Sequence, residues 1–305
     1  MRIVTLGTGA GRPTLQRFAS ATALEHEGEI LLFDCGEGTQ LQLMRSSLHW
    51  GRMSTIFIGH LHGDHLFGLP GLLGTMSLTE REDPLKLFGP AGLKAYLETL
   101  RTVKSLWLRF PLEVIEIEAP GRILETDSYE VFTAPLKHVI PCWGFRFSEK
   151  PRPGLFDEKK AEALGLPVGP LRRDLIEGRS VELADGRKIQ PHEVVGPPRP
   201  GLQFAYCLDT QPCETVVELS QGVDCLVHEA TFAKDLQSEA NRWGHSTAGE
   251  AAQMAKEAGA KQLVLTHLSS RYGEPKSLLQ EAKEVFENSL LAEDLENFPI
   301  CTSKN

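Results

Sequence analysis

The sequence lacks the features that mark membrane proteins and disulfide-rich secreted proteins. No apolar run reaches the ~18 residues that a membrane-spanning helix needs. The chain starts directly with the strand pattern Arg2-Ile3-Val4-Thr5-Leu6, which predicts no signal peptide and a cytoplasmic location. The six cysteines are irregularly spaced and include no CxxC pair, which argues against a disulfide framework and indicates reduced, buried thiols.

Positive charge is also scarce. Lysine and arginine number 32 against 41 acidic residues, so the formal net charge is −9. This balance argues against a protein coated in nucleic acid, although it leaves room for a locally basic docking surface. With 305 residues, 41% hydrophobic and 24% charged, the chain has the composition of a soluble globular protein with one large domain or two modest ones.

A phosphate-binding P-loop is missing as well. The early glycines in Gly7-Thr8-Gly9-Ala10-Gly11 could approach a phosphate, but no Lys-Ser/Thr pair and no helical pattern follow them. We therefore favour a turn between strands over a ligand cradle at this position.

What the sequence does contain is a cluster of metal-competent side chains, His60-Leu61-His62-Gly63-Asp64-His65. It follows the apolar run 55–58, which is typical of a buried strand. His60 and His62 point the same way in an extended segment, whereas Asp64 and His65 require a turn, which Gly63 permits. Imidazole and carboxylate ligands at this density indicate zinc-class ions, with one pair of ligands on each of two cations. A histidine-rich surface loop is the alternative.

Further metal-competent residues follow other strand-like runs. These residues are His138, Asp209 and His267. Strand ends are where sites assemble in layered α/β folds. A lone histidine after a strand is more often a core or surface residue than a ligand, so these three gain weight only through agreement with the first cluster. The resulting di-metal site has His60, His62 and His138 on one side, Asp64, His65 and His267 on the other, and Asp209 as a bridge.

The pattern of strands and helices predicts two β-sheets covered by helices on their outer faces, built from two similar halves. Helices are expected over residues 39–44, 91–102, 248–258 and 275–291, and strands over 112–117, 130–133, 203–209, 225–228 and 262–267. The sequence Thr247-Ala248-Gly249-Glu250 has the capping-box form and sets a helix start just after His245.

The composition changes between Pro151 and Pro200, where eight of the nineteen prolines lie. Such density predicts an inserted arm with a small hairpin, its strands at 181–183 and 187–189. From Lys137 to Arg173 the chain has eight basic and four acidic residues, a local balance of +4. Such an excess fits nucleic-acid binding, with a solvated loop as the alternative.

These motifs together resemble the metallo-β-lactamase superfamily and, within it, the ribonuclease Z family of tRNA 3′-processing endonucleases. The resemblance spans nearly the whole chain; its carrying segments are 6–11, 33–39, 60–65, 135–138, 206–209, 228–232, 244–247 and 265–267. His245-Ser246-Thr247 and the arm narrow it to this family, whose glycine–proline arm motif matches residues 165–170. The resemblance implies an αββα sandwich over residues 1–305, with an inserted tRNA exosite arm at 148–180.

The implied activity is a zinc-dependent endoribonuclease that removes the 3′ trailer of precursor tRNA just after the discriminator base. Two Zn²⁺ ions per subunit are expected, with Mn²⁺ possible on the same ligands. Metal binding lowers the pKa of water toward ~7, so that a nucleophile exists at neutral pH. Asp64 is expected to orient or deprotonate that water, and His245, assisted by Glu229, to protonate the departing oxygen. His228 is expected to support the site rather than to ligate a metal.

The implied partners are precursor tRNA and a second copy of the chain, with no membrane. We expect the arm to contact phosphates by shape readout rather than base readout. The expected RNA-binding residues are Lys150, Arg152, Lys159, Lys160, Arg172 and Arg173. Two other functions stay open: a hydrolase of the same superfamily that acts on a small phosphodiester or thioester, and a catalytically silent RNA-binding scaffold.

Overall fold

A computed structural model describes residues 1–301 and divides them into two compact units. The larger unit holds 1–125, 130–148 and the chain from 202 onward, and the smaller unit holds 126–129 and 149–201. None of the described helices is long and apolar enough to cross a membrane.

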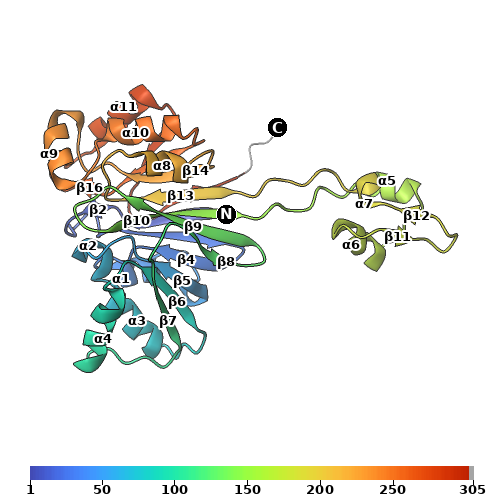
Figure 1. The fold of residues 1–305 in the computed structure, drawn as a ribbon, viewed down its shortest axis with the longest axis horizontal. Helices are drawn as coiled ribbons and strands as arrows, with labels where there is room; N and C mark the ends of the chain where they lie inside the picture. The colour runs from blue at the N-terminus through green and yellow to red at the C-terminus, as the bar shows by residue number, and fades with distance from the viewer. Residues whose placement is uncertain (302–305) are drawn as a thin grey trace. The chain divides into compact units, whose positions relative to one another are not determined.

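The larger unit is built on two seven-stranded sheets (Figure 1). The first sheet has the order β18-β1-β3-β4-β5-β6-β7. Its strands are β1 (Arg2–Gly7), β3 (Ala21–His26), β4 (Glu29–Phe33), β5 (Met53–Phe57), β6 (Leu85–Gly89), β7 (Leu112–Glu116) and β18 (Glu296–Pro299). The second sheet has the order β17-β15-β14-β13-β10-β9-β8. Its strands are β8 (Gly121–Glu125), β9 (Tyr129–Leu136), β10 (Cys142–Glu149), β13 (Gln203–Cys207), β14 (Cys225–Glu229), β15 (Leu263–Thr266) and β17 (Ser289–Leu291).

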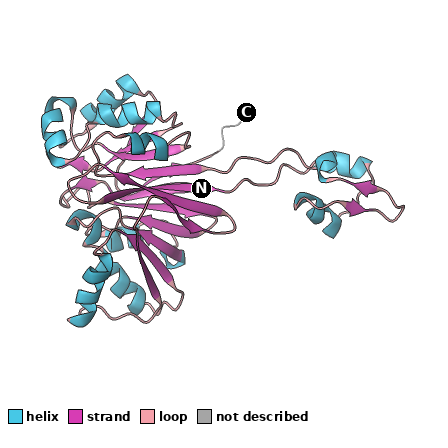
Figure 2. Ribbon diagram, in the orientation of Figure 1, coloured by secondary structure: helices cyan, strands magenta, loops and turns pink. Residues whose placement is uncertain are grey.

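Helices cover the outer faces of both sheets, while the strands lie between them (Figure 2). On the first sheet these are α1 (Thr39–Arg45), α2 (Gly63–Leu66), α3 (Leu69–Leu78) and α4 (Leu93–Thr102). On the second they are α8 (Glu214–Leu219), α9 (Gln237–Trp243), α10 (Ala248–Glu257) and α11 (Lys276–Val285). This arrangement is the expected αββα sandwich.

The two sheets pack against each other through a layer of buried aromatic rings. Phe33 of β4 lies 5.2 Å from Phe204 and 6.0 Å from Phe145, measured between ring centroids, and Phe57 lies 5.2 Å from Phe145. Strands β4, β5, β6 and β7 are parallel, and the residues of β4 and β5 are almost all buried, which explains why residues 55–58 form a continuous run rather than an alternating pattern. The sheets are therefore held rigidly at the point where the metal-competent loops leave them.

Two short strands link the halves beside this point. Strand β2 (Gly9–Ala10) pairs in parallel with β16 (Leu268–Ser269), so the early glycine segment lies next to the chain that follows His267. It is a turn and bridge between strands, as the absence of P-loop features indicated.

The C-terminal region differs from the prediction. The expected helix over 275–291 ends at Val285, and the chain then forms β17, which pairs with β15 in parallel. The exposed edge of β15 competes for this segment, and pairing with it outweighs local helical preference. Strand β18, which was not expected, pairs with β1 and places Pro299 on an outer strand, where a missing amide donor is tolerated.

The smaller unit has more regular structure than its proline content suggested. It contains the expected hairpin of β11 (Val181–Glu182) and β12 (Lys188–Ile189), and also α5 (Glu158–Ala163), α6 (Pro170–Ile176) and α7 (Pro191–Val194). Two of the prolines start helices, a position where a missing amide hydrogen has no cost. Its own small core is formed by Ala161, Leu166, Leu175, Val181, Leu183, Ile189 and Val194.

Candidate metal centre

The loop after β5 is fixed at its start by a neighbouring strand. Strands β4 and β5 are parallel, with Phe33 opposite Phe57, so the residues that follow them meet at the same sheet edge. Asp34 Oδ1 there accepts a 2.8 Å hydrogen bond from the Gly59 amide. The short helix α2 begins at Gly63 and supplies the turn that the sequence predicted. The metal-competent loop thus leaves a rigid strand in a defined direction.

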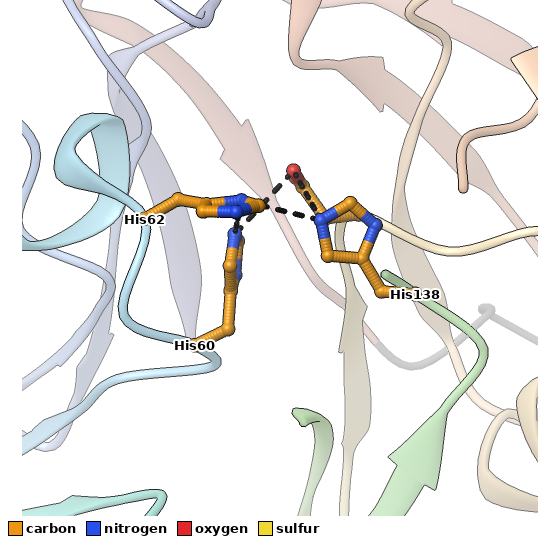
Figure 3. A group of neighbouring side chains, drawn as sticks. His60, His62 and His138 are labelled. Carbon is orange, nitrogen blue, oxygen red and sulfur yellow. Dashed lines mark hydrogen bonds and ion pairs between the residues drawn. The ribbon is translucent and has the colours of Figure 1, made fainter. Parts of the chain in front are cut away.

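One group of side chains in this loop converges with residues from the second sheet. His60 Nε2 lies 3.0 Å and His138 Nε2 lies 3.3 Å from His62 Nδ1, and the three rings point toward one another (Figure 3). Asp209 Oδ2 lies 3.6 Å from His60 Nε2 and 3.8 Å from His138 Nε2. The ligand atoms of these four residues all lie within 4.8 Å of one another, close enough to share one ion.

A second group forms on the other side of Asp209. His65 Nε2 and His267 Nε2 lie 3.3 Å apart, and Asp64 Oδ2 lies 3.5 and 3.3 Å from them. Asp209 Oδ1 is 3.1 Å from each of the two imidazole nitrogens. One oxygen of Asp209 therefore faces each group, and the structure brings all seven expected ligands together.

Backbone geometry at the strand ends aims these side chains. Asp34 after β4, Asp209 after β13 and His267 after β15 have φ values of +58°, +52° and +53°. Left-handed backbone at a non-glycine residue costs roughly 1–3 kcal/mol and is typical of functional sites. At Asp209 and His267 this conformation turns the side chain from the strand direction into the site.

The donor set fits a metal ion. Asp209 is 2% exposed, and its Oδ1 is buried without a hydrogen-bond donor. A buried carboxylate oxygen without a donor is unfavourable unless a cation lies beside it. Burial and the neighbouring His65 lower the pKa of His60 well below its usual value, so its imidazole is neutral and has a free lone pair. Mixed imidazole and carboxylate donors are those that zinc-class ions prefer.

Residues outside the expected set hold the ligands in place. His65 Nδ1 lies 2.7 Å from Asp34 Oδ2, which also accepts a 2.9 Å hydrogen bond from the Tyr206 hydroxyl. His267 Nδ1 lies 2.9 Å from Thr231 Oγ1. These contacts assign the Nδ1 proton of each ring and leave Nε2 as the metal-facing atom. The sequence places Asp34 and Thr231 in segments that resemble the family but does not predict their positioning role, because their partners His65 and His267 are distant in the chain.

The backbone carbonyl of Gly244 orients the third ring of the first group. Its oxygen lies 2.9 Å from His138 Nδ1. Gly244 has a φ of +77°, and a Cβ atom there would lie 2.8 Å from His138 Nδ1. The glycine is therefore required both by its conformation and by the close approach of the ligand.

His245 and Glu229 form a buried pair beside the two groups. His245 Nδ1 lies 3.0 Å from Glu229 Oε1, and the His245 ring lies 5.2 and 5.5 Å from those of His138 and His267. Burial alone would lower the pKa of His245, but the charge of Glu229 and the hydrogen bond to it raise that pKa to about 9. The sequence left the direction of this pKa shift open; the charge of Glu229 and its hydrogen bond to Nδ1 favour the imidazolium, which has a second N–H at Nε2.

Two contacts anchor this pair. The Thr210 amide donates to Glu229 Oε1 over 2.6 Å, and the Thr231 hydroxyl donates to Oε2 over 2.6 Å. Helix α10 begins directly after, with the expected capping box between Thr247 and Glu250. His228 lies outside both ligand groups, with its Nδ1 2.8 Å from the Glu229 carbonyl oxygen. The sequence expectation that His228 does not ligate is consistent with this position.

The basic residues expected to bind RNA all lie in the smaller unit, and most of them have acidic neighbours there. Arg173 pairs with Glu177 at 2.6 Å and Lys160 with Asp157 at 3.6 Å. Arg152 pairs with Glu149 and Arg172 with Glu158. Lys159 is exposed, and the Lys150 amide donates to the Ser128 carbonyl oxygen over 2.8 Å. Residues 149–201 hold ten basic and nine acidic side chains, so the +4 balance of the shorter window does not extend over this unit.

Comparison with known proteins shows which family and which solved structures this chain resembles. The family model described as "Anti-Pycsar protein Apyc1" matches residues 1–106, and the one described as "Beta-lactamase superfamily domain" matches residues 193–268. Ribonuclease Z of Methanosarcina acetivorans is 45% identical, over 98% of this chain and 98% of its own length. The crystal structure of the short form of human tRNase Z is 32% identical, with a TM-score of 0.70, and covers 99% of this chain and 100% of its own. The metallo-β-lactamase fold protein YhfI from Bacillus subtilis is 19% identical, with a TM-score of 0.68, over 97% of this chain and 98% of its own, which supports the fold alone.

Proposed function

This chain belongs to the ribonuclease Z family, and from that premise we propose that its two ligand groups bind two Zn²⁺ ions for the endonucleolytic processing of tRNA 3′ ends. The chain is a hydrolytic endoribonuclease of the metallo-β-lactamase fold. The proposed cut lies directly 3′ of the discriminator base. Asp209 carries the proposal for two ions, because its two oxygens face separate groups of ligands.

The bound cations would supply an activated water and neutralise charge on the phosphodiester. Asp64 would orient or deprotonate that water from its position beside His65 and His267. Burial would raise the pKa of Asp64, but these two histidines hold it well below its usual range, so its carboxylate stays ionised as a hydrogen-bond acceptor. The Gly11 amide donates to Asp64 Oδ2 over 2.7 Å and fixes its orientation.

His245 would protonate the 3′-oxygen that leaves on the tRNA body. Its Nδ1 is held by Glu229, so Nε2 is the atom that can donate. The charged partner keeps the ring protonated at neutral pH, which is the state a general acid needs. Hydrogen bonding of Glu229 to Thr210 and Thr231 keeps that carboxylate from turning toward the ligands.

The direct test is to map the cut. The protein is incubated with Zn²⁺, or with Mn²⁺ in parallel, and a 5′-labelled precursor tRNA that carries a short 3′ trailer. We expect one product that ends in a 3′-hydroxyl directly after the discriminator nucleotide, and none after chelation. Products that end elsewhere, or a chelator-resistant reaction, would contradict the proposal.

The arm at 148–180 is proposed as the tRNA exosite, within the smaller unit. Its ion pairs do not prevent this role, because exposed pairs contribute only ~0–1 kcal/mol and can be exchanged for phosphate contacts. The register suggests a clean deletion, since Ser148 of β10 lies opposite Gln203 of β13. Replacing residues 150–201 with an Asn-Gly turn closes these strands as a simple hairpin.

We expect this deletion to lower kcat/KM for precursor tRNA by about 100-fold or more, the gain that a linked second binding module supplies. Hydrolysis of bis(p-nitrophenyl) phosphate should be largely kept, because all seven ligands lie in the larger unit. Equal losses on both substrates would show that the arm supports folding rather than tRNA binding.

A homodimer is part of the proposal, and the apolar surface at α1 and α2 is the face we assign to it. Leu41 and Met44 on α1 and Phe67 after α2 are 50–64% exposed. Leu41 and Phe67 line one hollow with Pro13 and Phe18. Contiguous exposed apolar side chains favour a protein interface.

We propose a cytoplasmic location for this chain, because its proposed substrate is precursor tRNA.

Sedimentation equilibrium should report the mass of two chains for the native protein. Leu41→Glu should shift it toward the mass of one chain, because a charge would be buried in the interface. Leu78→Glu is the control, since Leu78 is 80% exposed at the far end of α3. A dimer that survives Leu41→Glu would place the interface elsewhere.

A further inference from the structure

Arg271 is an exposed cation in a fixed position. Its guanidinium lies over the Phe232 ring, 4.7 Å from the ring centroid, and its Nε donates to Ser269 Oγ over 3.1 Å. No ion pair within residues 1–301 involves it. The arginine is therefore held by an aromatic face and a hydroxyl, and its charge has no acidic partner.

The ring beneath Arg271 connects it to the reaction centre. The Phe232 ring packs against His245, with ring centroids 6.0 Å apart, and is 4% exposed. Arg271 also follows β16, which begins directly after the ligand His267. The cation thus lies at the edge of the site on the side of the proposed proton donor.

A guanidinium held in this way is suited to a phosphate. With Nε bonded to Ser269 and one face stacked on the ring, the Nη N–H groups are left to donate, and two such parallel donors match two phosphate oxygens. The substrate of this chain is a polyanion, and the chain itself carries a net charge of −9, so an unpaired cation at the site counters a general repulsion.

The proposed chemistry of the cut indicates which phosphate of the substrate Arg271 would contact. In the proposed reaction His245 protonates the leaving 3′-oxygen, which belongs to the nucleotide on the 5′ side of the cut. We infer that Arg271 binds the backbone phosphate at the 5′ side of that nucleotide, one position before the scissile phosphate. The inference rests on the proposed function and adds a positioning contact on the tRNA body that is separate from the arm.

Neutralising single phosphates tests this assignment. Precursor tRNAs are prepared with one methylphosphonate, either one position 5′ or one position 3′ of the scissile phosphate. Arg271→Ala should lower kcat/KM for the unmodified substrate by about 10- to 100-fold, the typical loss of a charged hydrogen bond. The 5′ methylphosphonate should lower native activity by a similar factor but have little further effect on Arg271→Ala. The 3′ methylphosphonate should affect both proteins equally.

Two variants separate binding from folding. Arg271→Lys should restore part of the loss, because it keeps the charge but not the planar fork. Arg109→Ala is the matched control, since Arg109 lies 5.1 Å over the Trp107 ring. Arg109 comes just before β7, which runs parallel to β6 and β5. It therefore lies at the edge of the sheet opposite the one where the ligands follow β5. The loss for Arg271→Ala should be at least about tenfold larger on precursor tRNA than on bis(p-nitrophenyl) phosphate.

Three results would overturn the inference. The first is a native kcat/KM for precursor tRNA in Arg271→Ala, and the second is an equal loss in this variant on precursor tRNA and on bis(p-nitrophenyl) phosphate. The third is that Arg271→Ala becomes insensitive to the 3′ methylphosphonate rather than to the 5′ one. A native protein that fails to cut precursor tRNA would instead overturn the proposed function, and this inference with it.

Discussion

Asp209→Ala should reduce turnover of precursor tRNA by about 1000-fold or more, because it removes the one side chain shared by both ligand groups. Loss of a metal clamp costs several kcal/mol of transition-state stabilisation, and each 1.36 kcal/mol corresponds to a factor of ten. Metal content measured by plasma mass spectrometry should fall below the two ions per chain that we propose for the native protein. Asp209→Asn should behave similarly, since it keeps the shape of the side chain but removes the charge.

Asp224→Ala is the control for this experiment. Its side chain is 8% exposed and pairs with Lys261 at 2.7 Å, but it precedes β14, at the opposite edge of the sheet from the site. We expect Asp224→Ala to lower thermal stability without loss of bound metal. Retention of two ions and near-native turnover in Asp209→Ala would refute the bridging role.

His245→Ala should lower kcat on precursor tRNA by ~10²–10⁴-fold while bound metal stays constant, because a general acid contributes about that much and His245 is not among the seven ligands. The effect should be smaller on bis(p-nitrophenyl) phosphate, whose nitrophenolate leaves without a proton. Comparing the two substrates therefore separates proton donation from a general disturbance of the site. An equal loss on both would contradict the assignment.

The pH dependence gives an independent check. A general acid must be protonated, so native activity should fall as pH rises through the pKa of His245. The charge of Glu229 raises that pKa to about 9, and bound cations would bring it lower, so the alkaline fall should lie at or below pH about 9. The fall should be absent in His245→Ala. In Glu229→Gln it should move to lower pH, because the charge that favours imidazolium is removed.

The local motif around the metal site could be predicted from sequence because its information is local. His60, His62, Asp64 and His65 lie within six residues after a strand, so their types and spacing already indicate two cations. Predicting that His138, Asp209 and His267 join the site required the further assumption that the strands before them end at the same sheet edge. The structure brings all seven together because β5, β9, β13 and β15 end there.

Contacts between distant segments could not be predicted in the same way. The hydrogen bonds of Asp34 to His65 and of Thr231 to His267 join residues 31 and 36 positions apart. Nothing in the local sequence distinguishes such a buried aspartate or threonine from a turn residue. The segment 289–291 likewise followed a helical pattern and became a strand because β15 offered an open edge.

The distribution of charge over the arm could be read from the sequence only in part. A window from Lys137 to Arg173 suggested a basic arm, whereas the folded unit places acidic side chains beside Arg152, Arg172 and Arg173. Counting charges along the sequence does not show which of them pair in the fold, such as Arg172 with Glu158, fourteen residues apart. Arg271 does not stand out in the sequence either, because it lies in no run of charges and its contacts with the Phe232 ring and the Ser269 hydroxyl are formed only in the fold.

The arm enters and leaves through the neighbouring strands β10 and β13, which remain in register up to Ser148 and Gln203. A hairpin tip is a place where chains accept insertions without disturbing the layers behind them. Over evolutionary time, therefore, this segment could be lengthened, shortened or exchanged while the scaffold that does the cutting stayed the same. In our proposal the arm binds the RNA, while all seven ligands lie in the larger unit, so the RNA-binding segment could change without any rebuilding of the site that cuts.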